Sequence, residues 1–283
     1  MKTLLHDFIQ VRAAVYQAPV PMTHVIYGYP TIKESLAWME TLLAQGVDIL
    51  EIQFPFSDPV ADGPTIANAC YQALINKPDL SQCLKDIEPL QQAYPNSKIL
   101  FMSYLNPIYR FGIQAFIDAA SKAGISGTII PDLPIEQADD YKKNCQQYSV
   151  TPIWLVTPAT PNIRIKKIVE QASDMLYCVS RSGVTGQKEE QKERQKENAL
   201  LSHSLKPNQT VLAEYIHGIQ SYISDTNPMS LAVGFGIRTP EQVQALNGVA
   251  DVAIVGSALL EAYNDGGIEA GTELVTSLFP YLN

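Results

Sequence analysis

The chain has 283 residues, of which 46% are hydrophobic, and a formal charge of −9 at pH 7. This acidic balance argues against a broad surface for nucleic acid or anionic membranes, which needs a basic face, but it leaves room for a small local anion site. No N-terminal signal peptide and no apolar run of about 18 residues is visible, so we expect a cytoplasmic protein without a membrane span.

The cysteines and histidines show no metal-binding pattern. They are scattered at Cys70, Cys83, Cys145 and Cys178, and at His6, His24, His203 and His217. Without a CxxC pair or ligand spacing, structural zinc is not expected. Free buried thiols in a reducing compartment are the default interpretation.

Predicted strands and helices alternate along the chain. A first helix over 3–17 precedes the first strand and could close the bottom of a barrel. Strands are predicted at 23–28, 50–54, 97–103, 127–131, 151–156, 175–179, 231–233 and 251–255. Helices are predicted at 31–46, 65–75, 80–94, after 107 to about 123, and at 134–148, 161–173, 210–224, 240–246, 258–263 and 268–281.

Eight strands separated by helical crossovers imply a parallel sheet, and eight of them favour closure over an open doubly wound sheet. No linker or shift in composition divides the chain. The sequence therefore predicts a single (β/α)8 TIM barrel over residues 1–283, with an extra N-terminal helix. It also carries a charged insertion after the sixth strand, QKEEQKERQKEN at 187–198, which contains no apolar residue. We interpret this insertion as a solvated, mobile loop or a loose helix. It could also act as a lid over the barrel mouth, and the two interpretations are compatible.

The stretch at 50–65 combines a strand with a loop rich in proline and aspartate. Alternation sends Leu50 to one face and Glu51 to the other, which in a parallel barrel is the interior at the catalytic end. A lone acid in an apolar run is costly to bury unless it is paired or functional. The loop adds Asp58 and Asp62. An aspartate before proline or glycine is most often only a turn former, but two acids in different surroundings can divide acid and base work.

Glycine-rich turns follow the last strands. Gly234-Phe-Gly-Ile237 follows the seventh strand, and Gly256-Ser257 follows the eighth and opens a helix. Barrels often hold a phosphate between these two loops, where backbone N–H groups approach the anion closely. Thr185-Gly186, after the sixth strand, could close a third side. A single glycine turn usually means only a tight turn, whereas two in register predict a phosphate-bearing ligand.

Three stretches together resemble the tryptophan synthase α subunit family. They are PFSDPVADGPT at 55–65, SRSGVTG at 180–186 and GFGI at 234–237, and the resemblance covers nearly the whole chain in order. It implies a (β/α)8 barrel that cleaves indole-3-glycerol phosphate to indole and glyceraldehyde 3-phosphate in tryptophan biosynthesis, without metal or organic cofactor. It also implies an α2β2 complex in which indole passes to the β subunit.

The resemblance assigns roles residue by residue. Glu51 and Asp62 match the two catalytic acids. The positions that match the substrate site are Tyr177, Tyr104, Ile129, Thr185, Gly186, Phe235, Gly236, Gly256 and Ser257. Asp58 and Pro134 match positions near the β-subunit contact. On this assignment Asp62 receives the indole N–H, while Glu51 protonates the ring carbon and takes the hydroxyl proton.

Departures from the family leave alternatives open. His24 and Tyr27 are unusual for the family and could face the indole pocket, although for His24 the interpretation as a packed strand residue is preferred. Gln53 could tune the pKa of Glu51 through a hydrogen bond. Two other functions are a stand-alone indole-releasing lyase and a catalytically silent phosphate-binding subunit that activates a partner. A phosphate-binding barrel of other chemistry also stays possible. We expect loops 55–65 and 183–200 to be mobile in the isolated chain.

Overall fold

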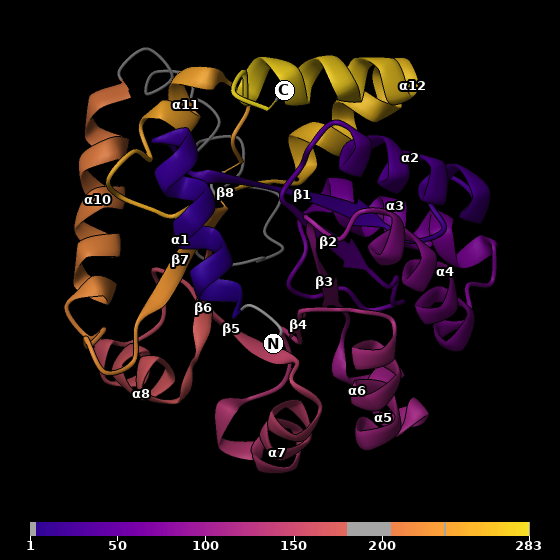
Figure 1. The fold of residues 1–283 in the computed structure, drawn as a ribbon, viewed down its shortest axis with the longest axis horizontal. Helices are drawn as coiled ribbons and strands as arrows, with labels where there is room; N and C mark the ends of the chain where they lie inside the picture. Colours follow the sequence, from indigo (N-terminus) through magenta and orange to yellow (C-terminus); the bar gives the residue numbers. More distant parts are fainter. Residues whose placement is uncertain (1–3, 180–204, 235, 283) are drawn as a thin grey trace, which may run out of the picture.

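The computed structural model describes residues 4–179, 205–234 and 236–282. Its eight parallel strands form one closed barrel in chain order, from β1 to β8 (Figure 1). The strands are β1 (Val20–Ile26), β2 (Ile49–Gln53), β3 (Lys98–Met102), β4 (Gly127–Ile129), β5 (Thr151–Val156), β6 (Asp174–Val179), β7 (Met229–Gly234) and β8 (Val252–Val255). The predicted fold class is confirmed.

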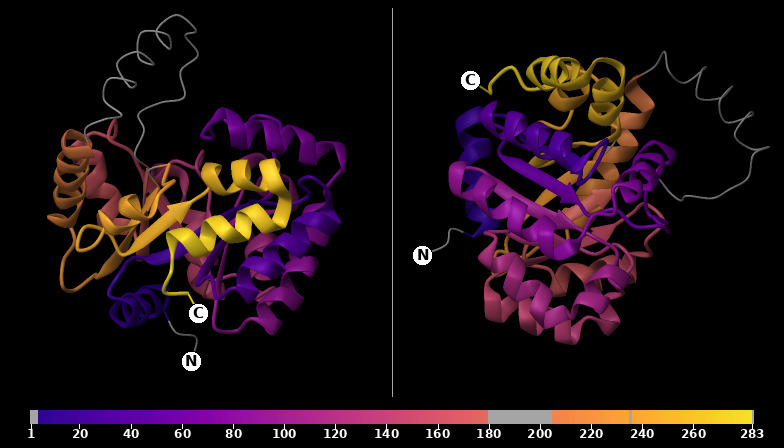
Figure 2. Two further views of the ribbon diagram at one scale, coloured as in Figure 1. Left: turned by 90° about the horizontal axis from the view of Figure 1, so that it is seen from above. Right: turned by 90° about the vertical axis from the view of Figure 1, so that its right-hand side faces the viewer.

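Helices surround the barrel on its outer side (Figures 1 and 2). They are α2 (Ile32–Ala44), α3 (Pro64–Ile75), α4 (Leu80–Ala93), α5 (Leu105–Phe111), α6 (Ile113–Lys122), α7 (Asp139–Tyr148), α8 (Asn162–Gln171), α10 (Leu205–Gln220), α11 (Pro240–Gln244) and α12 (Ser257–Leu278), with a short 3-10 turn η1 (Ile135–Gln137). Apart from α12, which follows β8, they lie in the crossovers between successive parallel strands.

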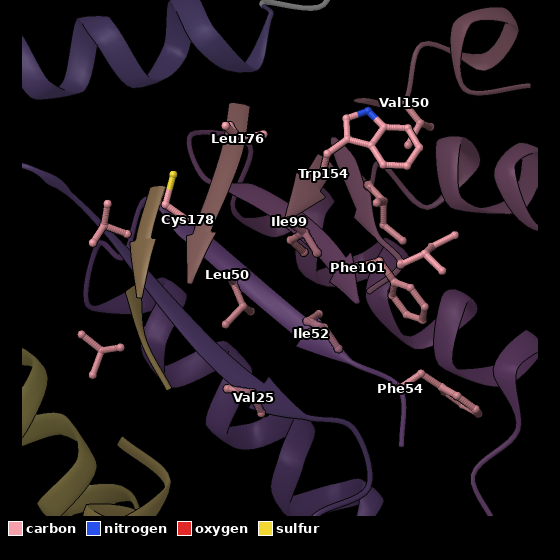
Figure 3. Close-up of a cluster of buried hydrophobic side chains, with 14 of the residues drawn as sticks. Val25, Leu50, Ile52, Phe54, Ile99, Phe101, Val150, Trp154, Leu176 and Cys178 are labelled. Carbon is pink, nitrogen blue, oxygen red and sulfur yellow. The ribbon is translucent and has the colours of Figure 1, made fainter. Parts of the chain in front are cut away.

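The alternation in β2 separates two layers of core. Leu50, Ile52 and Phe54 belong to the outer cluster between strands and helices, which Figure 3 shows together with side chains from β3 and β5. Ile49 belongs to the inner cluster inside the barrel. This is the division that the period of two predicts, and it sends Glu51 into the interior.

An additional helix, α1 (Leu5–Tyr16), covers the bottom of the barrel (Figure 2). Leu5 and Ile9 are buried in the inner cluster, so the helix contributes apolar side chains to the barrel interior. Arg12 also forms an ion pair of 2.9 Å with the buried Asp48 carboxylate, just before β2. The expected plug is confirmed, and it closes the end opposite the predicted catalytic end.

Several element boundaries differ from the prediction; for example, the helix expected from 134 begins at Asp139, after the 3-10 turn η1. β1 begins at Val20 and includes Pro21, because a proline near the start of a strand sacrifices few ladder hydrogen bonds. The single helix expected up to 123 is two helices, α5 and α6, since Gly112 between them has φ +94°, outside the helical region. The two C-terminal helices join as α12, which is kinked at Gly266 and Gly267.

The four cysteines are free and buried, as expected. Within the described ranges, no helix combines the length and apolarity needed to cross a membrane. The same residues contain no group of three or more His, Cys, Asp or Glu side chains arranged to hold a metal ion. The charged insertion at 187–198 lies outside the described residues, so the choice between solvated loop and lid stays a prediction.

Candidate active site

Glu51 is held inside the barrel with only 3% of its surface exposed. Burial raises the pKa of its carboxyl to about 7, and the neighbouring Asp62 charge raises it further, while His24 and the Tyr177 hydroxyl act in the opposite direction. Its Oε2 atom has no hydrogen-bond partner. A carboxyl with a pKa near neutrality can both give and take a proton at physiological pH.

Asp62 approaches Glu51 from the loop that follows β2. This loop folds through two short turns, in which Val60 N–H donates to Asp58 C=O at 2.9 Å and Asp62 N–H donates to Pro59 C=O at 3.0 Å. The Asp62 Oδ2 atom accepts hydrogen bonds from Gln53 Nε2 at 2.7 Å and from the Tyr104 hydroxyl at 2.9 Å. The loop therefore holds its carboxylate at the barrel mouth.

The pKa of Asp62 is raised by burial. The hydrogen bond from Gln53, the His24 charge and the Tyr104 hydroxyl all lower this pKa in part. The two acids therefore sit in different surroundings: Glu51 in an apolar interior and Asp62 among donors. This difference is the arrangement that lets two carboxyl groups take different roles.

Aromatic and aliphatic side chains form the wall beside the acids. Tyr104 is fully buried, stacks on Phe56 with ring centroids 5.4 Å apart, and its hydroxyl also accepts Ala61 N–H at 3.0 Å. Ile129 belongs to the same inner cluster as Tyr104, and Tyr177 packs against it. The pKa of Tyr177 is raised well above its ordinary value by burial and by the Glu51 and Asp62 charges.

The predicted phosphate turns end β7 and β8 at the same edge of the barrel as the acids. Gly236 has φ +63°, a conformation that favours glycine, and Gly256 immediately precedes α12, whose first residue is Ser257. Free N–H groups at the start of a long helix attract anions. Thr185, Gly186 and Phe235 lie outside the described residues, so their predicted role at this turn stays a prediction.

The two predicted partner-contact residues lie on the surface. Asp58 and Pro134 are both exposed, on the loops after β2 and β4. The Asp58 carboxylate accepts a hydrogen bond from the Ser57 hydroxyl at 2.6 Å, so its described contact is local. Neither residue belongs to the group around Glu51.

Sequence reasoning only partly placed the side chains around Asp62. His24 and Gln53 face the interior, where His24 Nε2 and Gln53 Oε1 are 2.7 Å apart. The amide of Gln53 contacts Asp62, not the expected Glu51. The suggestion that Tyr27 faces the indole pocket is wrong: it packs against Phe54 in the outer layer and donates a 2.6 Å hydrogen bond to Asp86.

Another missed contact joins two loops at the barrel mouth. Asp132, after β4, accepts the backbone N–H of Leu105 at 2.8 Å, at the start of α5. A carboxylate beside the first N–H groups of a helix stabilises that helix. The Asp-Leu-Pro sequence at 132–134 signals a turn, but the partner on the preceding loop is not visible from sequence.

Comparisons with known proteins identify the family of the chain. The family model for "Tryptophan synthase alpha chain" matches residues 12–277. The tryptophan synthase alpha chain of Syntrophotalea carbinolica is 33% identical over 257 residues, covering 91% of this chain and 93% of that protein. That of Thioalkalivibrio sulfidiphilus is 34% identical over 280 residues, covering 98% and 97%.

A solved structure shows the same fold. The structure of Mycobacterium tuberculosis tryptophan synthase aligns with a TM-score of 0.83 and 28% identity, covering 98% of this chain and 97% of that chain. The family model spans residues 12–277, which include the strand that carries Glu51 and the loop that carries Asp62. The chain belongs to the tryptophan synthase alpha chain family.

Proposed function

We propose that Glu51 and Asp62 are the two acids with which this chain cleaves indole-3-glycerol phosphate to indole and glyceraldehyde 3-phosphate. As a member of its family, the chain is a carbon–carbon lyase of tryptophan biosynthesis. The observation that carries the assignment is a buried Glu51 whose pKa is near 7, beside an Asp62 carboxylate held by two donors.

The reaction balances with these two groups alone. Protonated Glu51 gives its proton to the indole carbon that bears the glycerol chain, and Asp62 accepts the ring N–H and stabilises the positive charge that develops there. The Glu51 carboxylate then takes the proton of the hydroxyl next to the breaking bond. The carbonyl of glyceraldehyde 3-phosphate forms, the carbon–carbon bond breaks, and its electron pair returns to the ring as neutral indole.

Other residues bind the two ends of the substrate. Gly236, Gly256 and Ser257 hold the phosphate with backbone N–H groups and the Ser257 hydroxyl, and Thr185, Gly186 and Phe235 complete that site. Tyr104, Ile129 and Tyr177 border the indole. Support comes from the inner cluster around Tyr104 and from the position of Gly256 before α12.

The finer biological setting is also part of the proposal. The chain folds as one domain, acts in the cytoplasm and pairs with a tryptophan synthase β subunit in an α2β2 complex that receives indole, with Asp58 and Pro134 at the contact. The exposure of both residues supports this, as does the Mycobacterium tuberculosis structure, which is of a tryptophan synthase. The free buried cysteines fit a reducing compartment.

Indole release from indole-3-glycerol phosphate tests the assignment. We expect wild type to release indole, faster with the β subunit, and Glu51→Gln and Asp62→Asn to lose at least about a hundredfold in kcat, since each proton transfer contributes roughly that much. Asp118→Asn, at the ion pair with Lys122 on the surface of α6, is the matched control and should match wild type. Wild-type rates in both acid variants would overturn the assignment. Full activity without the β subunit would favour a stand-alone lyase.

A further inference from the structure

Hydrogen bonds link three side chains from different parts of the chain at the barrel mouth. His24 of β1 is 7% exposed and Gln53 of β2 is fully buried. His24 Nε2 is 2.7 Å from Gln53 Oε1, and Gln53 Nε2 is 2.7 Å from Asp62 Oδ2. We define these residues as the His24–Gln53–Asp62 relay.

We propose that His24 and Gln53 are positioning residues that hold the Asp62 carboxylate in its reacting place within the isolated chain. This inference rests on the proposed role of Asp62. Asp62 stands on a loop, but two side chains of the barrel interior, His24 and Gln53, position its carboxylate.

The direction of the hydrogen bonds follows from charge. An ionised Asp62 accepts only, so the Gln53 amide must turn its NH2 group toward Asp62 and its oxygen toward His24. His24 must then carry a proton on Nε2 to donate to that oxygen. The relay is therefore complete when Asp62 is ionised, which is the form that can receive the indole N–H.

The contacts leave one carboxylate oxygen for the substrate. Gln53 and Tyr104 both donate to Asp62 Oδ2, and no other described side chain donates to Oδ1. A carboxylate anchored through one oxygen can direct the other at a ring N–H without first ordering the loop, and such preorganisation lowers the barrier.

The relay also reaches toward the predicted phosphate turn. A Cβ atom at Gly256 would lie 3.6 Å from the Cβ of His24 and 3.8 Å from its Nδ1, so the imidazole sits directly beside that turn. His24 also pairs with Glu51 in the register of β1 and β2. The His24 side chain therefore lies beside the predicted phosphate turn at Gly256, beside Glu51 and beside the Gln53 amide.

Removing the donors should change the titration of Asp62 as well as the rate. The groups that face it are Glu51 and Gln53 of β2, His24 of β1, Tyr104 after β3, Cys70 of α3 and Tyr177 of β6. Of these, Gln53, His24 and Tyr104 lower the pKa of Asp62. Without Gln53 this pKa rises, so Asp62 takes up its proton at higher pH and the acid limb of the rate profile moves upward.

The test compares Gln53→Met and His24→Phe with Asp118→Asn as the control. The two relay variants keep side-chain bulk but remove the hydrogen bonds of the relay from either side. Asp118 pairs with Lys122 on the surface of α6, whereas Cys70 Sγ accepts a hydrogen bond from Gln53 Nε2 at 3.5 Å and is therefore not a neutral position. We expect kcat of the isolated chain to fall roughly tenfold or more in both relay variants, with the acid limb shifted up, because hydrogen bonds to charged groups contribute that much. Asp118→Asn should keep the wild-type profile.

A double variant identifies the residue through which the relay acts. In an Asp62→Asn background, Gln53→Met should cause little further loss, since its effect passes through Asp62. An equal further loss there, or an unchanged rate and pH profile in folded Gln53→Met and His24→Phe, would overturn the relay. If Asp62→Asn itself remains fully active, the proposed function fails instead, so the two failures are distinguishable.

Discussion

At the scale of single residues, burial of the Glu51 carboxyl group costs folding free energy but gives the group a pKa suited to proton transfer. An ionised carboxylate is strongly disfavoured in an apolar interior, and this cost is what moves its pKa from 4.5 to about 7. The same burial that weakens the folded state makes the group a competent acid and base at neutral pH. With the role proposed for Glu51, burial of this one carboxyl group lowers stability and supports activity.

Replacing this carboxyl should reveal the cost as a pH dependence of folding. The folded chain holds the Glu51 proton to higher pH than the unfolded chain, so wild type loses stability as pH rises from about 4.5 through 7. Glu51→Gln lacks this loss and should gain roughly 3 kcal/mol relative to wild type across that interval. Urea unfolding at both ends of the interval measures it, and parallel stability curves for the two proteins would contradict the account.

The sequence predicted the interior position of Glu51 but not the contacts among the side chains near it. The period of two in β2 sufficed to send Glu51 inward, and the loop motif identified Asp62. The contact of Gln53 with His24 requires the register between β1 and β2, which pairs Ile26 with Gln53. Register between strands far apart in sequence depends on how the whole barrel closes, so no local pattern could have given it.

At the scale of elements, close packing decides where helices meet. Gly271 of α12 is buried against α2, where an added Cβ would lie 2.6 Å from the Trp38 ring. Trp38 is itself only 4% exposed and tilts against Tyr263 at 5.5 Å, so its ring has little room to yield. A glycine that interrupts a helix in sequence here permits the close approach of two helices.

Alanine at two helical glycines should separate packing from helix propensity. Gly271→Ala should lower the free energy of unfolding by about 1–2 kcal/mol, because overpacking outweighs the gain in propensity. Gly218→Ala, in the exposed face of α10 with nothing within 4 Å of the added Cβ, should raise it by up to about 1 kcal/mol. Thermal or urea unfolding of both variants checks this, and stabilisation by both would show that Trp38 yields.

Helix boundaries were less predictable than helix existence. The helix expected up to 123 divides at Gly112 because that residue adopts φ +94°, which a hydrophobic pattern does not encode. Pro107 falls in the first turn of α5, where a missing N–H costs nothing, so it begins a helix instead of only ending a strand. In both places the sequence correctly marked glycine and proline as residues that alter a helix. Whether each one divides or begins the helix depended on tertiary packing.

At the scale of the whole molecule, the closed barrel explains why distant residues meet. Parallel strands present all their carboxyl ends at one edge, so His24, Glu51, Tyr104 and Tyr177 converge although 153 residues separate the first from the last in numbering (177 − 24). The fold class followed from counting eight strand–helix units. The closing of the bottom by α1 followed from the position of that helix before β1.

The proposed partner surface belongs to this scale too. Asp58 and Asp62 stand on one short loop, with Asp58 exposed and Asp62 bonded into the site. A protein that contacts the loop at Asp58 can therefore shift the position of Asp62, the proposed catalytic acid four residues away. The proposed relay would position the Asp62 carboxylate in the isolated chain, before any partner binds the loop.

A single-turnover experiment tests the central claim most directly. Excess protein is mixed with indole-3-glycerol phosphate in the presence of the β subunit, and bound substrate and free indole are followed for wild type and Glu51→Gln. The account predicts that wild type converts its bound substrate, whereas Glu51→Gln binds it and leaves it intact, because the proton that starts the cleavage is missing. Cleavage by Glu51→Gln at the wild-type rate would contradict the account.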